Sequence, residues 1–122
     1  FDFWRVDGKK VEVKTDWYSL DSTEFFFMER WSDIDKKKPG GPWQSQDKTD
    51  LFVYLFIRDG VYFEFDDMDA LVERLEDLTK DLKLIKIRNR GYSGGGYKVP
   101  LAELSDLYVD YRLYWSVDDG EL

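Results

Sequence analysis

Two carboxylates and a lysine near the start of the chain have the residue types and spacing needed for hydrolytic chemistry. Asp2 is followed by Glu12 and Lys14, which stand at alternate positions of one short segment. Carboxylates, together with the Val13 main-chain carbonyl, are the hard oxygen ligands that Mg²⁺ or Mn²⁺ prefers. A metal held there lowers the pKa of bound water and neutralises charge on a phosphate oxygen, while Lys14 can position or activate that water. The group therefore predicts a metal-dependent phosphodiester hydrolase.

These side chains share one face only if residues 1–16 form a hairpin in the right register. The aromatic residues 1–6 are typical of a strand, and residues 10–16 alternate between apolar and charged side chains. Asp7-Gly8 is a strong turn signal. A three-residue loop over Asp7, Gly8 and Lys9 sets Asp2 opposite Lys14, with Glu12 on the same face. The other face, which we expect to pack on the core, carries Phe1, Phe3, Val11 and Val13.

An ordinary interpretation of the same spacing stays open. Glu-x-Lys is common on strands, where it usually forms a weak ion pair on a solvated surface. The consistently apolar opposite face favours a folded hairpin under either interpretation.

The composition limits the kinds of site that the chain can build. Its 122 residues fit a single domain spanning 1–122, and they include neither cysteine nor histidine. Disulfides, Cys/His zinc centres and Ser-His-Asp or Cys-His nucleophiles are therefore excluded. The net charge of −8 argues against loose, charge-driven binding to nucleic acid. No apolar run approaches the ~20 residues of a membrane span and no signal peptide is visible, so we expect no membrane contact. For a chain without cysteine, the reducing cytoplasm is the default expectation.

The remaining segments predict an α/β fold. The clearest is a helix over residues 67–82, whose apolar side chains recur at helical spacing. Residues 32–50, with Pro39-Gly40-Gly41-Pro42, are expected to form a long polar loop, and residues 91–96 a flexible glycine-rich one. We expect strands over residues 24–31, 51–57, 61–65, 84–88 and 108–116, a short helix over 101–107 and an acidic tail over 117–122.

Three further acidic residues are candidates for accessory roles at the site. Glu29 either serves as an additional acid or ends a strand, and Asp16 either supports the site from behind or belongs to a turn. Asp50, with Lys48 nearby, either joins the site or marks the entry to the central strand.

A basic segment over residues 83–98, which begins with Lys83, is suited to contact with a nucleic acid. Basic and aromatic side chains follow one another there without an intervening acid, an arrangement that favours phosphate contact and base stacking. We expect Lys86, Arg88, Arg90 and Lys98 to face the same side as Lys14. Strand alternation would place Ile85 and Ile87 in the core, and the glycine-rich loop would carry Arg90 and Lys98. The ordinary alternative is a polar strand edge beside a mobile loop. The predicted nucleic-acid-binding residues are Lys86, Arg88, Arg90, Lys98, Tyr92 and Tyr97.

The order of these motifs resembles that of the PD-(D/E)XK, or restriction-endonuclease-like, nuclease superfamily, in particular its small phage and bacterial members. Asp2 with Val11-Glu12-Val13-Lys14-Thr15-Asp16 matches the core motif. The later matching segments are Phe27-Met28-Glu29, Gly40-Gly41, Lys48-Thr49-Asp50, the helix over 67–82, and Gly94-Gly95-Gly96 before Val99-Pro100-Leu101. The resemblance covers residue 2 to about residue 104.

This resemblance implies a mixed four-stranded central β-sheet flanked by helices. It implies Asp2 and Glu12 as metal ligands, Lys14 as the water-positioning base, Mg²⁺ or Mn²⁺ as cofactor, and a nucleic acid, DNA more than RNA, as the substrate. A homodimer or a larger complex is compatible with it. The superfamily usually has a helix before the first catalytic strand, whereas this sequence starts at that strand, so the first helix is expected to be absent.

Two other functions stay open. The acidic excess, concentrated in residues 49–122, is compatible with a non-enzymatic acidic phage protein that mimics DNA or inhibits a DNA-binding protein. A catalytically silent subunit on the same fold is the second alternative.

Overall fold

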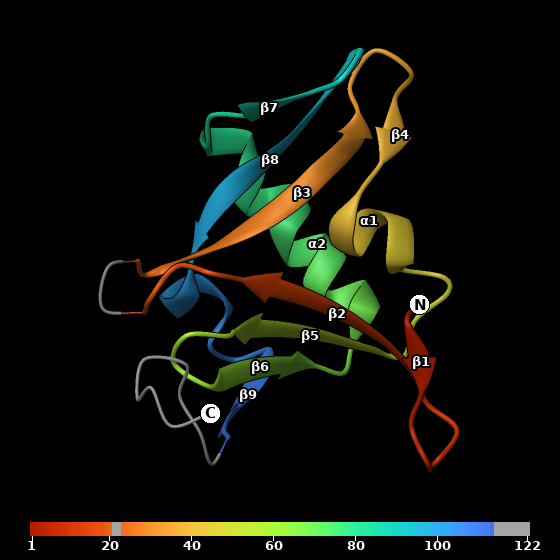
Figure 1. The fold of residues 1–122 in the computed structure, drawn as a ribbon, viewed down its shortest axis with the longest axis vertical. Helices are drawn as coiled ribbons and strands as arrows, with labels where there is room; N and C mark the ends of the chain where they lie inside the picture. Colours follow the sequence, from red (N-terminus) through yellow and green to blue (C-terminus); the bar gives the residue numbers. More distant parts are fainter. Residues whose placement is uncertain (21–22, 114–122) are drawn as a thin grey trace.

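The strands form two sheets with a helix packed between them. The computed structural model describes residues 1–20 and 23–113 (Figure 1). One sheet has the strand order β1-β2-β5-β6-β9, and the other has the order β4-β3-β8-β7. The strands are β1 (Phe3–Trp4), β2 (Lys10–Asp16), β3 (Phe25–Asp33), β4 (Lys38–Pro39), β5 (Leu51–Phe56), β6 (Val61–Phe65), β7 (Ile85–Asn89), β8 (Tyr92–Pro100) and β9 (Tyr108–Arg112). The helices are α1 (Gly41–Ser45) and α2 (Met68–Leu78), with 3-10 turns over Thr79–Asp81 and Leu101–Leu104.

The predicted α/β class is confirmed, and the sheet arrangement differs from the expected one. The strands divide between a five-stranded mixed sheet and a four-stranded antiparallel sheet, rather than forming a single four-stranded sheet. In the described part of the chain, no helix is long and apolar enough to cross a membrane. The predicted acidic tail and residues 114–116 of the last predicted strand lie outside the described residues.

The main hydrophobic core lies between the two sheets and α2, which Figure 1 shows crossing behind β3 and β8. Asp67 begins α2 by accepting a hydrogen bond from Ala70 N at 3.0 Å, as an N-cap does. The helix then buries one apolar face against aromatic side chains of β3, β5 and β6. The core residues in contact there include Phe26, Tyr54, Phe56, Phe63, Phe65, Leu71 and Leu75.

Parallel pairing of β2 with β5 decides which face of β2 meets that core. Glu12 pairs with Phe52 and Lys14 pairs with Tyr54, so the charged face of β2 points to the same side as these core residues. The expectation that Phe1 and Phe3 face the core is therefore wrong, because they lie on or beside the outer face, 44% and 48% exposed.

The glycine run expected to be a flexible loop is the middle of strand β8. A Cβ on Gly96 would lie 2.5 Å from Met28 O, and one on Gly94 would lie 3.0 Å from Trp31 O. The glycines are needed because the backbone of β3 passes too close for a side chain. Arg90 and Lys98 are consequently fixed by the β7–β8 hairpin instead of being carried on a mobile loop.

The segment expected to be one long loop contains β4 and α1. Gly40 and Gly41 lie against Glu29, where a Cβ on Gly40 would overlap the Glu29 carboxylate and one on Gly41 would lie 2.6 Å from Glu29 O. Pro42 then occupies the first turn of α1, where its missing N–H costs nothing. The glycines thus serve close packing of α1 on β3.

Candidate functional site

The β1–β2 hairpin carries the predicted catalytic residues in a register two residues from the predicted one. Phe3 pairs with Val11, and Gly8 N donates to Arg5 O at 2.9 Å, so the loop is Val6-Asp7-Gly8. The prediction placed the loop one residue further along, which is wrong because Gly8, with φ of +86°, takes the third, left-handed position. Because strand side chains alternate, a two-residue shift leaves each residue on the face that was predicted.

Asp2 is held against the main chain of β2. Its N–H donates to Val11 O at 2.8 Å, and its Oδ2 accepts from Val13 N at 2.7 Å. The carboxylate therefore lies beside Val13. The predicted register required Asp2 to lie opposite Lys14, which is wrong. Among the described residues, none donates a hydrogen bond to Oδ1 of Asp2, so this oxygen keeps its lone pairs for a ligand.

Glu12 is oriented by a residue that the sequence did not single out. Its Oε2 accepts a hydrogen bond of 3.1 Å from the Ser45 hydroxyl, and its Oε1 lies 3.4 Å from the amino group of Phe1. Ser45 is buried in α1. Sequence reasoning did not identify Ser45 because residues 32–50 were expected to form a loop. The one signal of a packed turn there is the Gly40-Gly41-Pro42 run.

Glu12, Lys14 and Glu29 line one cavity, which we name the β2 cavity. Its walls come from β2, β3, β5 and the start of α1. The lining includes Glu12, Lys14, Phe27, Glu29, Gly41 and Phe52. The structure thus brings the accessory candidate Glu29 together with two of the three predicted catalytic residues. Asp2, the residue before β1, accepts a hydrogen bond from the Val13 amide on β2.

The donors available at this point are hard oxygen ligands. Within residues 1–20 and 23–113, no group of three or more His, Cys, Asp or Glu side chains is placed to hold a metal ion. The predicted set has only two carboxylates, from Asp2 and Glu12, plus the Val13 carbonyl. A pair of carboxylates with water filling the other positions is a usual way for proteins to bind Mg²⁺, so the donor chemistry fits that ion.

Asp16 stabilises the end of β2 instead of facing the β2 cavity. Its Oδ2 accepts a hydrogen bond of 2.5 Å from the Tyr54 hydroxyl, and its Oδ1 accepts from Tyr18 N at 2.8 Å. Tyr54 in turn accepts from Phe27 N at 2.9 Å. Burial, and next the bond to Asp16, raise the pKa of the Tyr54 phenol. The hydrogen bonds among Asp16, Tyr54 and Phe27 thus connect β2, β5 and β3.

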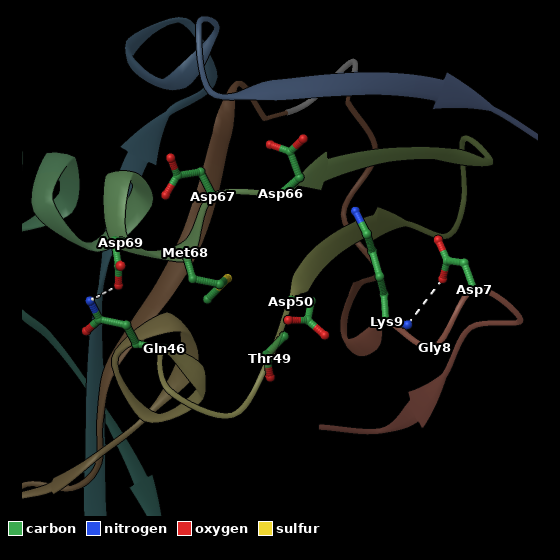
Figure 2. A pocket seen from close by; sticks show the side chains of 10 residues that line it. All are labelled: Asp7, Gly8, Lys9, Gln46, Thr49, Asp50, Asp66, Asp67, Met68 and Asp69. Atoms are coloured by element: carbon green, nitrogen blue, oxygen red, sulfur yellow. Dashed lines mark hydrogen bonds between the residues drawn. The ribbon is translucent and has the colours of Figure 1, made fainter.

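Asp50 lies at the opposite end of β2, in an open acidic hollow (Figure 2). Its carboxylate accepts from Lys10 N at 2.8 Å, and its own N–H donates to Lys10 O at 2.9 Å. It therefore joins the starts of β2 and β5 and does not line the β2 cavity. Five aspartates line the acidic hollow, namely Asp7, Asp50, Asp66, Asp67 and Asp69.

A second groove continues from Lys14 toward the other sheet, and we name it the aromatic groove. It passes between the end of β2 and strands β3, β7 and β8. Its lining includes Lys14, Trp17, Tyr18, Phe25, Ile87 and Lys98, together with Asp16. Sequence reasoning identified Lys14, Asp16 and Lys98 in this lining, but none of these three aromatic residues, of which Phe25 was expected only as part of the strand over 24–31.

The other predicted nucleic-acid-binding residues do not share this side. Ile85 and Ile87 line the aromatic groove, so the expectation that they lie in the core is wrong, and strand alternation turns Lys86 and Arg88 to the opposite face. The reason is that β7 is an edge strand whose apolar side faces the groove.

The remaining three also differ in their surroundings. Tyr97 packs against the hydrophobic core, which removes it from the predicted set of free stacking surfaces. Tyr92 is exposed next to the β7–β8 turn, and Arg90 lies in that turn. Of the six predicted residues, Lys98 alone lines the groove with Lys14.

Comparisons of this chain with protein-family models, with curated proteins and with solved structures found no match.

Proposed function

We propose that this chain is a metal-dependent phosphodiester hydrolase that cleaves DNA, built around β2 on a restriction-endonuclease-like core. The observation that carries the proposal is the β2 cavity, in which Glu12, Lys14 and Glu29 converge from two strands. Asp2, the residue before β1, has one carboxylate oxygen fixed on Val13 N. A solvated strand face would not require a buried serine on Glu12, nor two glycines packed against Glu29 on the facing strand.

In this proposal, Asp2, Glu12 and the Val13 carbonyl hold Mg²⁺ or Mn²⁺. When bound, the metal supplies Lewis acidity and acidifies its bound water. Ser45 keeps the Glu12 carboxylate in one orientation through its hydrogen bond, in the way that outer-shell donors orient metal ligands. Glu29 adds negative charge at the same cavity.

Lys14 positions the reacting groups. Its ammonium group donates hydrogen bonds to the attacking water and to a non-bridging phosphate oxygen, which sets the water in line with the leaving oxygen. The water oxygen bonds to phosphorus as the bond between phosphorus and the leaving sugar oxygen breaks. The water gives up a proton to solvent, and the leaving oxygen takes one up. We place the activity in the bacterial or host cytoplasm, in a monomer, a homodimer or a larger complex.

The test is incubation of circular and linear DNA with Mg²⁺ or Mn²⁺. The wild type should cleave, and Lys14→Ala and Glu12→Gln should cleave at least about a hundredfold more slowly, as expected for the loss of a catalytic group. Lys80→Ala, an exposed lysine after α2, is the matched control and should retain full activity. Cleavage by Lys14→Ala at the wild-type rate would contradict the proposal.

A thermal measurement tests the metal separately from the chemistry. Because a ligand that binds only the folded state stabilises it, Mg²⁺ or Mn²⁺ should raise the Tm of the wild type. Neither metal should raise the Tm of Glu12→Gln. An equal rise in both proteins would mean that the ion binds elsewhere.

A second candidate function is supported by the acidic hollow. Five aspartates gather there around β1, β5 and α2 (Figure 2), which suits an acidic protein that mimics DNA and occupies a DNA-binding protein. Such a protein, or a catalytically silent subunit on the same fold, shows no metal-dependent cleavage. The mimic would in addition bind a DNA-binding protein in competition with DNA.

A further inference from the structure

The aromatic groove begins where the β2 cavity ends, because Lys14 lines both. Large aromatic side chains stand in solvent along it, with Trp17 63% and Tyr18 72% exposed. Phe25 and Ile87 are also exposed on its walls. A contiguous exposed patch of this kind is typical of a binding surface.

The charges in the groove differ in sign from those of the whole chain. Of the described residues that line it, Lys14 and Lys98 are the cations and Asp16 is the acid. Asp16 keeps its charge while its oxygens accept hydrogen bonds from Tyr54 and from Tyr18 N. With two lysines and one aspartate the lining is net positive, in a chain whose net charge is −8, while the acidic hollow at the other end of β2 repels anions.

We propose that the aromatic groove binds an unpaired strand of DNA, so that the preferred substrate carries a single-stranded segment next to the cleaved bond. The inference rests on the proposed function for the role of Lys14. Unpaired bases expose their faces and stack on aromatic side chains without regard to sequence, and Trp17 and Tyr18 offer such faces. Phosphates of the same strand lie against Lys98 and Lys14. A duplex hides its base faces and would set its phosphates against the apolar walls.

Binding is measured without metal, in EDTA, with a fluorescein-labelled oligothymidylate of about 12 nucleotides, the size range that single-strand sites cover. A duplex of the same length is the comparison. The wild type should prefer the single strand. Trp17→Ala should weaken that binding by about tenfold or more, as loss of one stacked base does, whereas Trp17→Phe should keep most of it because a ring remains.

The lysine contribution is measured in the same assay. Lys98→Ala should weaken binding and lower the salt slope by about 0.7, the value for one contact to a single strand. Lys86→Ala, on the opposite face of β7, is the matched control for charge. Tyr111→Ala, an exposed aromatic of β9 that stacks on Tyr62, is the control for aromatic loss. Both controls should bind within about twofold of the wild type.

The outcomes separate this inference from the proposed function. Three outcomes would each overturn the assignment of the groove to single-stranded DNA. They are wild-type affinity in Trp17→Ala, a preference for the duplex, and tighter binding of an oligouridylate than of the oligothymidylate. Metal-dependent cleavage of plain duplex, at equal rates in the wild type and Trp17→Ala, would overturn the groove and leave the nuclease standing. Trp17-dependent binding of the single strand without metal-dependent cleavage would overturn the nuclease and leave the groove as a single-strand site.

Discussion

The hydroxyl of Ser45, the last residue of α1, donates a hydrogen bond of 3.1 Å to Oε2 of Glu12 on β2. This bond joins the short helix to the strand that carries the predicted catalytic residues. It also gives the proposed metal ligand a fixed orientation, which a glutamate on a solvated strand would lack.

Replacing Ser45 with alanine should loosen Glu12. A hydrogen bond to a charged group contributes about 1.5–3 kcal/mol, and we expect a loss of about 1–2 kcal/mol in the free energy of unfolding because water can replace part of it. Urea denaturation measures this. Ser32→Ala, whose hydroxyl makes only a long bond of 3.5 Å to Lys38 O, should change stability by less than about 0.5 kcal/mol. Equal losses in the two variants would show that the Ser45 bond contributes little.

Tyr54→Phe should destabilise the fold by about 1–3 kcal/mol, because it removes the hydrogen bond to Oδ2 of Asp16 and the acceptor of the Phe27 N–H. The effect should also depend on pH. The pKa of Tyr54 in the folded state is raised above the ordinary value of 10, so the folded state holds its proton more tightly than the unfolded state does. The contribution is full below pH 10 and is lost as the pH rises above it. Urea titrations at several pH values should therefore show the wild type losing its advantage over Tyr54→Phe above pH 10, and a constant difference would contradict this.

The Asp7 carboxyl should titrate near pH 2. The side-chain hydrogen bond from Arg5 is the main cause that lowers its pKa from 3.8 to about 2. A lowered pKa stabilises the hairpin above pH 3.8, and this contribution is lost as the pH falls through 2. An NMR titration of the carboxyl carbon measures the pKa directly. Arg5→Ala should move it upward and Arg112→Ala should leave it unchanged, whereas an unchanged value in Arg5→Ala would rule out the Arg5 bond as the cause.

Gly96→Ala should be among the most damaging small substitutions in the chain. Its Cβ would lie 2.5 Å from Met28 O and 2.9 Å from Glu29 Cα, and the overlap with backbone should cost about 3 kcal/mol. Gly91→Ala is the control, because open space surrounds its Cβ and only the positive φ of +77° disfavours alanine there. We expect this backbone conformation to cost about 1 kcal/mol. Thermal unfolding compares the two variants. A milder effect at position 96 than at position 91 would mean that β3 and β8 can move apart.

The strand pattern of β2 could be predicted because alternation is a local property of the sequence. Glu12 and Lys14 on one face and Val11 and Val13 on the other follow from a period of two, and this holds even after a two-residue shift in register. Which face meets the core could not be predicted, because it depends on the parallel partner β5, some forty residues further along the chain.

Glycines explain most of the other differences. A run such as Gly94 to Gly96 reads as a flexible loop because it has no side-chain period, yet here each glycine marks the close approach of a neighbouring strand. Gly40 and Gly41 mislead in the same way next to Glu29. Close approach is a tertiary property, and the sequence alone does not say which backbone will lie there.

Parallel pairing of β2 with β5 also has a consequence for the order in which the molecule matures. A hairpin can close as soon as its two strands exist, but Glu12 obtains its neighbour Phe52 only after the whole of β3, β4 and α1 has been synthesised and folded back. Long-range closure of this kind is slow. We therefore expect the proposed catalytic site to stay incomplete during synthesis until β5 has left the ribosome. Pulse-labelled hydrogen exchange should show the amide of Asp2, which donates to Val11 O across the hairpin, protected before that of Ile57, which donates to Asp16 O on β2.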